Sequence, residues 1–160
     1  MRYADPLLAL SFLCVALLTG CGWEQKFRSR AEGRDAEVVI QQRLPANSWG
    51  TRILVNAAGH RNSIYQYRGD SFLQFIDIAW TENREVFTVV TCGTPYIKMA
   101  YNIRRGGSIP FEPLEAVAIA HIRTAYHLEP TMSSAEVMAW ACSWDGTHAF
   151  LKRHPEARER

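Results

Sequence analysis

The histidines of this chain are the first residues to test for chemistry, because an imidazole can move a proton or bind a metal ion. His121 and His127 are six residues apart, and so are His148 and His154. A zinc-binding pair on one helix face needs a spacing of three or four residues. The spacing therefore predicts no metal site and no cofactor. We expect His121 to be a hydrogen-bonded helix residue.

The same histidines could instead belong to a hydrolytic site. His148 lies six residues after Cys142, which would place an imidazole base near a thiol nucleophile. His148 or His121 could also act with nearby carboxylates such as Asp77 or Asp145. No third, orienting group is evident in the sequence. We therefore predict no catalytic residue and a protein that is not an enzyme, with a small hydrolase as the alternative.

The first two thirds of the chain should position these groups on strands. Six runs rich in β-branched and aromatic residues are separated by turn residues, at 38–44, 52–55, 64–67, 72–80, 86–92 and 96–103. In the last of these, Ile97, Met99 and Tyr101 alternate with polar side chains. Period-two patterning of this kind predicts an antiparallel meander of about five or six strands.

The last third changes to helical periodicity. Pro113 stands where a helix would begin, and an apolar stripe at 3.6 spacing follows as far as Ala125. Ser133 and Glu136 form a capping-box pattern before a second stripe that extends to Trp144. The predicted fold class is α+β, with two C-terminal helices packed on one face of the sheet.

An apolar run occupies the N-terminal part of the chain and ends in small residues. Residues 7–18 carry no charge, but this run is short of the about 20 residues that a membrane-spanning helix needs. Its length fits the apolar region of a secretory signal. The run closes with Leu18-Thr19-Gly20-Cys21, which resembles the lipobox of bacterial lipoprotein precursors.

The resemblance to lipoprotein precursors implies a specific fate for Cys21. In that family this cysteine is the first residue of the mature chain and carries acyl chains such as palmitate. Residues 1–20 would then be a signal peptide, and the mature protein would be held on a membrane of the cell envelope by its N-terminal lipid. Gly22 stands where an Asp commonly causes retention in the inner membrane. In a host with two membranes, this favours the outer membrane, facing the periplasm.

The four cysteines separate into two groups under this interpretation. Cys14 is removed with the signal and Cys21 carries the lipid, which leaves Cys92 and Cys142. In an oxidising envelope these two cysteines favour a disulfide. The open alternative is a pair of buried thiols packed as small apolar groups. A disulfide would also take the sulfur that a pair with His148 requires.

Charge and composition divide the mature chain further. Residues 24–37 mix four basic and four acidic residues with one large apolar side chain, Phe27. Such a composition predicts a flexible tether over residues 21–36, one domain over 37–151 and a loose charged tail over 152–160. The formal net charge of +2 gives no case for nucleic-acid binding.

These observations favour a membrane-anchored envelope lipoprotein whose domain is a non-enzymatic binding or accessory module. The expected partners are the membrane, through the lipid, and an envelope protein or glycan. Aromatic residues such as Trp49, Tyr65, Tyr67 and Tyr101 are candidates for an exposed face, although core packing is the simpler interpretation of each. An exposed cluster of three or more aromatic side chains would mark a partner site.

Overall fold

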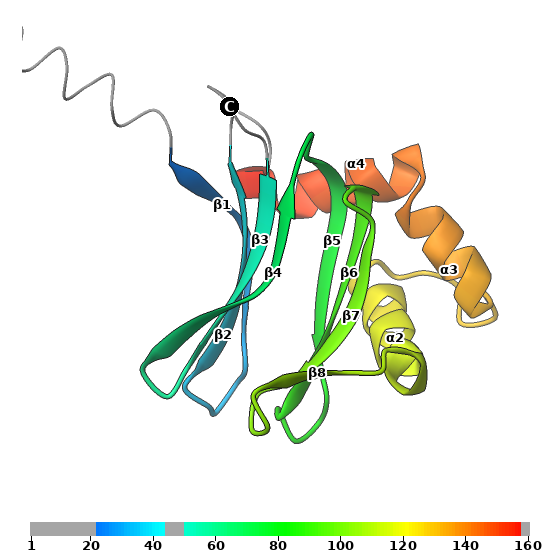
Figure 1. Cartoon of the computed structure of the whole chain (residues 1–160). Coiled ribbons are helices and arrows are strands. Elements are labelled where there is room, and N and C mark those ends of the chain that lie inside the picture. Colours follow the sequence, from blue (N-terminus) through cyan, green and yellow to red (C-terminus); the bar gives the residue numbers. More distant parts are fainter. Residues whose placement is uncertain (1–21, 44–49, 158–160) are drawn as a thin grey trace, which may run out of the picture.

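The computed structural model describes residues 22–43 and 50–157, and it shows a mixed α+β architecture in three layers (Figure 1). Two four-stranded antiparallel sheets lie against each other, and helices cover the second sheet. No helix among these residues is long and apolar enough to cross a bilayer. The predicted signal peptide, the lipobox and Trp49 lie outside the described residues.

The first sheet has the strand order β1-β2-β3-β4. Its strands are β1 (Trp23–Arg30), β2 (Ala36–Arg43), β3 (Gly50–Ala57) and β4 (His60–Arg68). Alternation directs Val38, Ile40, Ile53 and Val55 toward the second sheet, where they are buried. No layer formed by the described residues covers the opposite face of the sheet in Figure 1, and arginines such as Arg28 and Arg52 lie on it.

The second sheet has the order β5-β6-β7-β8. Its strands are β5 (Phe72–Trp80), β6 (Val86–Thr94), β7 (Ile97–Asn102) and β8 (Gly107–Ile109). Ile76, Ile78 and Trp80 of β5 face the first sheet, whereas Phe75 and Asp77 face the helices. Both faces are covered, which explains why β5 and β6 are buried along most of their lengths.

The helical layer follows the second sheet in the chain. It contains a 3₁₀ turn, η1 (Glu112–Leu114), three α-helices, α2 (Glu115–Ala125), α3 (Ser134–Ala141) and α4 (Trp144–Arg153), and a second 3₁₀ turn, η2 (Pro155–Ala157). Helix α2 packs on β5 and β6, and α4 packs on β5. Helix α3 packs on α2 and α4, and η2 reaches β1.

This architecture corrects the predicted meander in its strand number, its continuity and its helix packing. The described residues form eight strands instead of five or six, because β1 and β8 lie outside the predicted runs. The strands form two sheets instead of one, because β4 and β5 do not pair. The connection between them places Ser71 in the interior, where its hydroxyl contacts Gln42 and Thr51 of the first sheet. The predicted last helix is two helices, since Ser143 caps α4 directly after α3 ends.

The predicted flexible tether is wrong over the part that the structure describes, residues 22–36. Strand β1 pairs with β2 from Trp23 to Arg30, and the chain then turns directly into β2. Phe27 supplies the apolar contact, since its ring packs against Phe150 and His154. Lys26 is buried and forms an ion pair with Glu24 at 2.9 Å. The charged side chains of an edge strand with one open face do not prevent strand formation.

The predicted loose tail is likewise wrong as far as residue 157. Helix α4 continues to Arg153, and η2 follows at Pro155–Ala157. The Arg153 guanidinium donates to the carbonyl oxygen of Ala125, and the His154 ring packs edge-on against Phe27. These side chains are polar, but the imidazole ring and the aliphatic part of the arginine pack against neighbouring residues. A prediction from charge alone does not take this packing into account.

Candidate functional site

A small cavity lies where four elements meet, at the edge of the second sheet next to β1. Its volume is about 120 Å³, and residues of β1, β5, α2 and the end of α4 line it. The polar side chains that line it are Arg28, Ser29, Asp77, His121, Tyr126, Arg153 and His154. This is a dense set of groups able to exchange protons or hydrogen bonds, and it is therefore the candidate site.

Asp77 is the innermost of these groups. It occupies the centre of β5, and alternation in the strand directs it toward α2 rather than toward the first sheet. Its side chain is only 5% exposed. One carboxylate oxygen, Oδ1, lies 2.8 Å from Nδ1 of His121, whereas the other, Oδ2, is buried without a hydrogen-bond partner. A buried oxygen without a donor is costly, so Asp77 has an unused acceptor position in this site.

His121 connects this carboxylate to the surface. On α2 its neighbours Ala118 and Ile122 are buried, and the imidazole lies at the edge of that apolar face with 49% of its side chain exposed. The hydrogen bond that His121 donates to Asp77 raises the pKa of His121 above its ordinary value, and partial burial opposes the shift. A carboxylate on Nδ1 orients the imidazole and leaves Nε2 available to a ligand or a water molecule.

Tyr126, Arg153 and His154 complete the wall of the cavity. Burial, together with the nearby Asp77 carboxylate, raises the pKa of the Tyr126 phenol well above its usual range, so the phenol stays a neutral hydroxyl. Arg153 lies over the Tyr126 ring, with its guanidinium carbon 5.6 Å from the ring centroid. Nδ1 of His154 lies 3.2 Å from Glu156. Sequence reasoning missed Arg153 and His154 because both were assigned to a loose tail.

The contact between Asp77 and His121 can perform two kinds of chemistry. It can bind a polar group that donates to Asp77 and contacts the imidazole, or it can use the oriented imidazole as a general base toward water. Among the described residues, His121 makes no hydrogen bond to a serine, threonine or cysteine. Ser29 lines the cavity, but its hydroxyl accepts a hydrogen bond from Nε1 of Trp80 at 3.0 Å. The described residues also hold no group of three side chains suited to a metal ion.

The other predicted histidine and carboxylate candidates do not join this site. His148 and Asp145 both lie on exposed positions of α4, and neither lines the cavity. His127 is exposed just after α2. His121 is hydrogen-bonded on its helix as expected, and its partner is one of the two carboxylates named from the sequence. The pairing itself has no local signal, since 44 residues separate the two side chains.

The predicted disulfide is confirmed. Cys92 near the end of β6 and Cys142 at the end of α3 are bonded, with their Cα atoms 5.2 Å apart. The bond fastens the helical layer to the second sheet. The suggested nucleophile pair of Cys142 and His148 is wrong, because the sulfur of Cys142 is already in the disulfide.

The aromatic residues divide between the core and one end of the molecule. Tyr101 is buried, and Tyr65 is partly buried against the core, so core packing is correct for both. The large apolar side chains that the structure leaves exposed are instead Phe72, Tyr96 and Trp144. None of the three was named as an exposed candidate from the sequence.

Comparisons with known proteins add no information about the candidate site. No family model matches the sequence, and no curated protein or solved structure is significantly similar to it.

Proposed function

We propose that this chain is a membrane-anchored envelope lipoprotein whose folded domain is a non-enzymatic binding or accessory module. One observation carries the proposal. With Cys92 bonded to Cys142, the lipobox residue Cys21 is the one cysteine of the predicted mature chain left to carry lipid. A disulfide is also typical of proteins that fold in an oxidising compartment. Gly22 favours the outer membrane, facing the periplasm, in a host with two membranes.

The lipid anchor accounts for a lasting attachment to the membrane. Each buried CH₂ group of an acyl chain contributes about 0.8 kcal/mol, so two or three chains hold a protein far longer than one. The domain then works at a membrane surface, where an envelope protein or glycan is within reach. The cavity beside Asp77 and His121 offers such a partner an unpaired acceptor, Asp77 Oδ2, behind a half-exposed imidazole.

Mass spectrometry of the N-terminal peptide tests the anchor. We expect the mature chain to begin at an acylated Cys21, and Cys21→Ala to release or mislocalise the protein. Cys14→Ala is the matched control, because it removes a cysteine from the predicted signal and should leave processing unchanged. A wild-type mature chain that is soluble and unacylated would contradict the lipoprotein proposal.

Crosslinking from intact envelopes tests the binding role. A photoreactive residue at Arg28, on the rim of the cavity, should capture a partner that the same residue at Glu82, away from the cavity, does not capture. Asp77→Asn in the Arg28-labelled chain should weaken that capture, since it changes the buried acceptor. Equal capture at both positions would argue against a role for the cavity.

A small envelope hydrolase remains the second candidate, and the 2.8 Å contact between Asp77 and His121 specifically favours it. In such a hydrolase the imidazole would act as general base toward water, because it makes no hydrogen bond to a serine, threonine or cysteine among the described residues. Removing a general base lowers a hydrolytic rate by about 10²–10⁴-fold. We therefore expect His121→Ala to abolish any ester or amide hydrolysis, and the exposed His148→Ala to leave it unchanged. Equal rates in the two variants would rule out the His121 site.

A further inference from the structure

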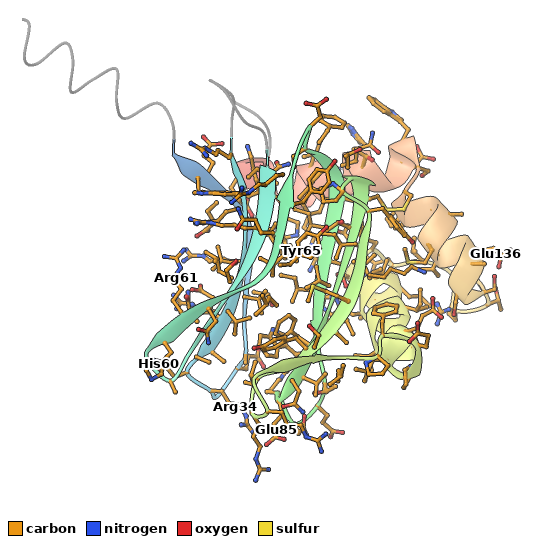
Figure 2. The ribbon with its side chains drawn as sticks, viewed as in Figure 1. Arg34, His60, Arg61, Tyr65, Glu85 and Glu136 are labelled. Carbon is orange, nitrogen blue, oxygen red and sulfur yellow. A yellow bond between two sulfur atoms is a disulfide. The ribbon has the colours of Figure 1, made fainter. Side chains whose placement is uncertain are left out.

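The two ends of the paired sheets differ in their exposed side chains. The Trp23 end, where β1 begins, also contains the end of β4, the start of β5 and the turn between β6 and β7 (Figure 1). The contacts of Ser71 with Gln42 and Thr51 tie the two sheets together there. At the opposite end, the Arg34 end, the hairpins after β1, β3 and β5 project, and Arg34 pairs with Glu85 (Figure 2).

The exposed aromatic side chains gather at the Trp23 end. Phe72 begins β5 and is 54% exposed, and Tyr96 lies in the turn after β6 and is also 54% exposed. Trp144 begins α4 and is 81% exposed, and the disulfide holds the preceding corner against the end of β6. By contrast, the Arg34 end carries ion pairs between Arg34 and Glu85 and between Arg84 and Glu32. The exposed aromatic side chains therefore lie at one end, among exposed charged residues such as Arg68 and Asp70, and the other end carries the ion pairs.

The chain leaves little distance between this aromatic end and the predicted lipid. Strand β1 begins at Trp23, two residues after Cys21. An extended chain spans at most about 3.6 Å per residue, so the Cα atoms of Cys21 and Trp23 are at most about 7 Å apart. The domain therefore has no flexible spacer at its start, and whatever holds Cys21 also holds the Trp23 end.

We propose that the Trp23 end docks on the lipid bilayer that holds the acyl chains, with Phe72, Tyr96 and Trp144 in the headgroup region. This inference rests on the proposed lipid attachment at Cys21. Tyrosine and tryptophan side chains favour the boundary between hydrocarbon and water, where an apolar ring and a polar tip are both accommodated, and Phe72 adds apolar area beside them. Docking in this orientation directs the charged Arg34 end away from the membrane.

The contact depends on aromatic burial more than on charge. Asp70 and Asp145 lie beside Phe72 and Trp144 in sequence and are exposed, so this end is not uniformly basic. The domain should therefore bind neutral as well as anionic bilayers. Added salt should change this binding little, because salt screens charges but does not remove apolar burial.

Vesicle partitioning of the mature chain, residues 21–160 with Cys21→Ser, tests the docking surface without the lipid. The probe is phosphatidylcholine vesicles, with and without phosphatidylglycerol, at 0.1 M and 0.5 M salt. We expect binding to both vesicles, and at least an approximately tenfold loss when Phe72, Tyr96 and Trp144 are replaced by Ala. The matched control replaces His60, Arg61 and Asn62, three exposed residues of the β3–β4 hairpin, by Ala and should bind as the wild type does (Figure 2). Circular dichroism of both variants verifies the fold.

Three results would overturn the inference. The first is that neither variant differs from the wild type in vesicle binding. The second is that the wild type binds only anionic vesicles and detaches at 0.5 M salt. The third is hydrogen-exchange protection of Phe72, Tyr96 and Trp144 in native envelopes but not on protein-free vesicles, which would make this end a protein interface. A chain lacking acylated Cys21 would instead overturn the proposed function, whatever the vesicles show.

Discussion

The two sheets of this domain differ in what covers them. The second sheet lies between the first sheet and the helices, so β5 and β6 are buried on both faces. The first sheet has one covered face and one open face. On the open face, Val39 and Leu54 are nevertheless only 3% and 4% exposed. Arg28 lies opposite Val39 in the neighbouring strand, and Arg52 lies two residues before Leu54 on the same face, so that long side chains cover both.

This difference separates the tasks of the two sheets. The second sheet carries the helices, the disulfide and Asp77 of the candidate site. The first sheet carries the chain entry at Trp23, next to the predicted lipid, and contributes Ser29 to the cavity wall. The well-covered sheet thus holds the candidate site, and the half-covered sheet is the one that would lie next to the proposed lipid anchor. Contacts within the second sheet and its helices, and contacts between the two sheets, can each be removed by mutation to test this difference.

The largest expected effect comes from the disulfide, which belongs entirely to the second sheet and its helices. Replacing Cys92 and Cys142 together by Ala should lower the free energy of unfolding by about 4 kcal/mol, because a closed loop of about 50 residues restricts the unfolded chain. Urea denaturation measures the loss. Hydrogen exchange should show that the helical layer loses more protection than β2 and β3.

Reduction of the wild-type protein provides the control for this variant. Cys142 is exposed, so a reductant can reach the bond. The reduced wild type should lose a similar free energy, and the double variant should be insensitive to reductant. Equal loss of protection in both sheets would contradict a separation of the domain into two unequal parts.

A smaller effect is expected at Ser71, where the chain crosses between the sheets. Its hydroxyl contacts Nε2 of Gln42 at 2.8 Å and also the hydroxyl of Thr51, and all three residues are buried. Ser71→Ala should cost about 2 kcal/mol, because it leaves buried polar groups without their common partner. Ser63→Ala, at an exposed position of β4, should cost less than about 0.5 kcal/mol. A similar cost for both variants in urea denaturation would show that the crossing contributes little.

A single hydrogen bond between the two sheets should contribute less to the free energy of unfolding than the contacts of Ser71. Nε1 of Trp80 donates to the Ser29 hydroxyl at 3.0 Å, which joins β5 to β1. In a double-mutant cycle of Trp80→Phe and Ser29→Ala, we expect a coupling free energy of about 1 kcal/mol. The cycle separates this bond from the apolar area that Trp80→Phe also removes. A coupling near zero would mean that apolar packing alone holds β1 to the second sheet.

The sequence predicted best the elements whose own pattern determines them. Alternation identified β2 to β7, and the capping box of Ser133 and Glu136 is present at the start of α3. Strand β1 was missed because its stability comes from pairing with β2 and from Phe27 against Phe150, which are contacts between distant residues. Helix α4 begins at a new cap, and Gly146 permits the close approach to α3: a Cβ there would lie 2.3 Å from the Trp140 carbonyl oxygen.

The candidate site was predictable as residue types but not as an arrangement. Asp77 was named as one of two carboxylates that could act with a histidine, and His121 as a hydrogen-bonded histidine of a helix. Their contact depends on how α2 docks on β5, which no local pattern encodes. Arg153 and His154 enter the site only because α4 extends through residues whose charges predicted a loose tail.

The smallest expected effect is the pH dependence of the contact between Asp77 and His121, which fastens α2 to the second sheet alone. The pKa of His121 is raised above its usual value, chiefly by the hydrogen bond to Asp77. A group whose pKa is higher in the folded state stabilises the fold fully below its unfolded pKa, about 6.5 for histidine. That stabilisation is lost as the pH rises through the folded pKa. The half-exposed imidazole is screened by water, so the change should be small.

Nuclear magnetic resonance titration of His121 measures this pKa directly. Asp77→Asn should lower the pKa toward the ordinary value and flatten the dependence of stability on pH above about 6.5. The resonances of β2 and β3 should not respond to the titration, because no residue of these two strands lines the cavity that holds the pair. The exposed His148, which does not line the cavity, provides the reference resonance. If the His121 pKa were the same in both proteins, the carboxylate would not be controlling the imidazole, and the hydrolase candidate would lose its base.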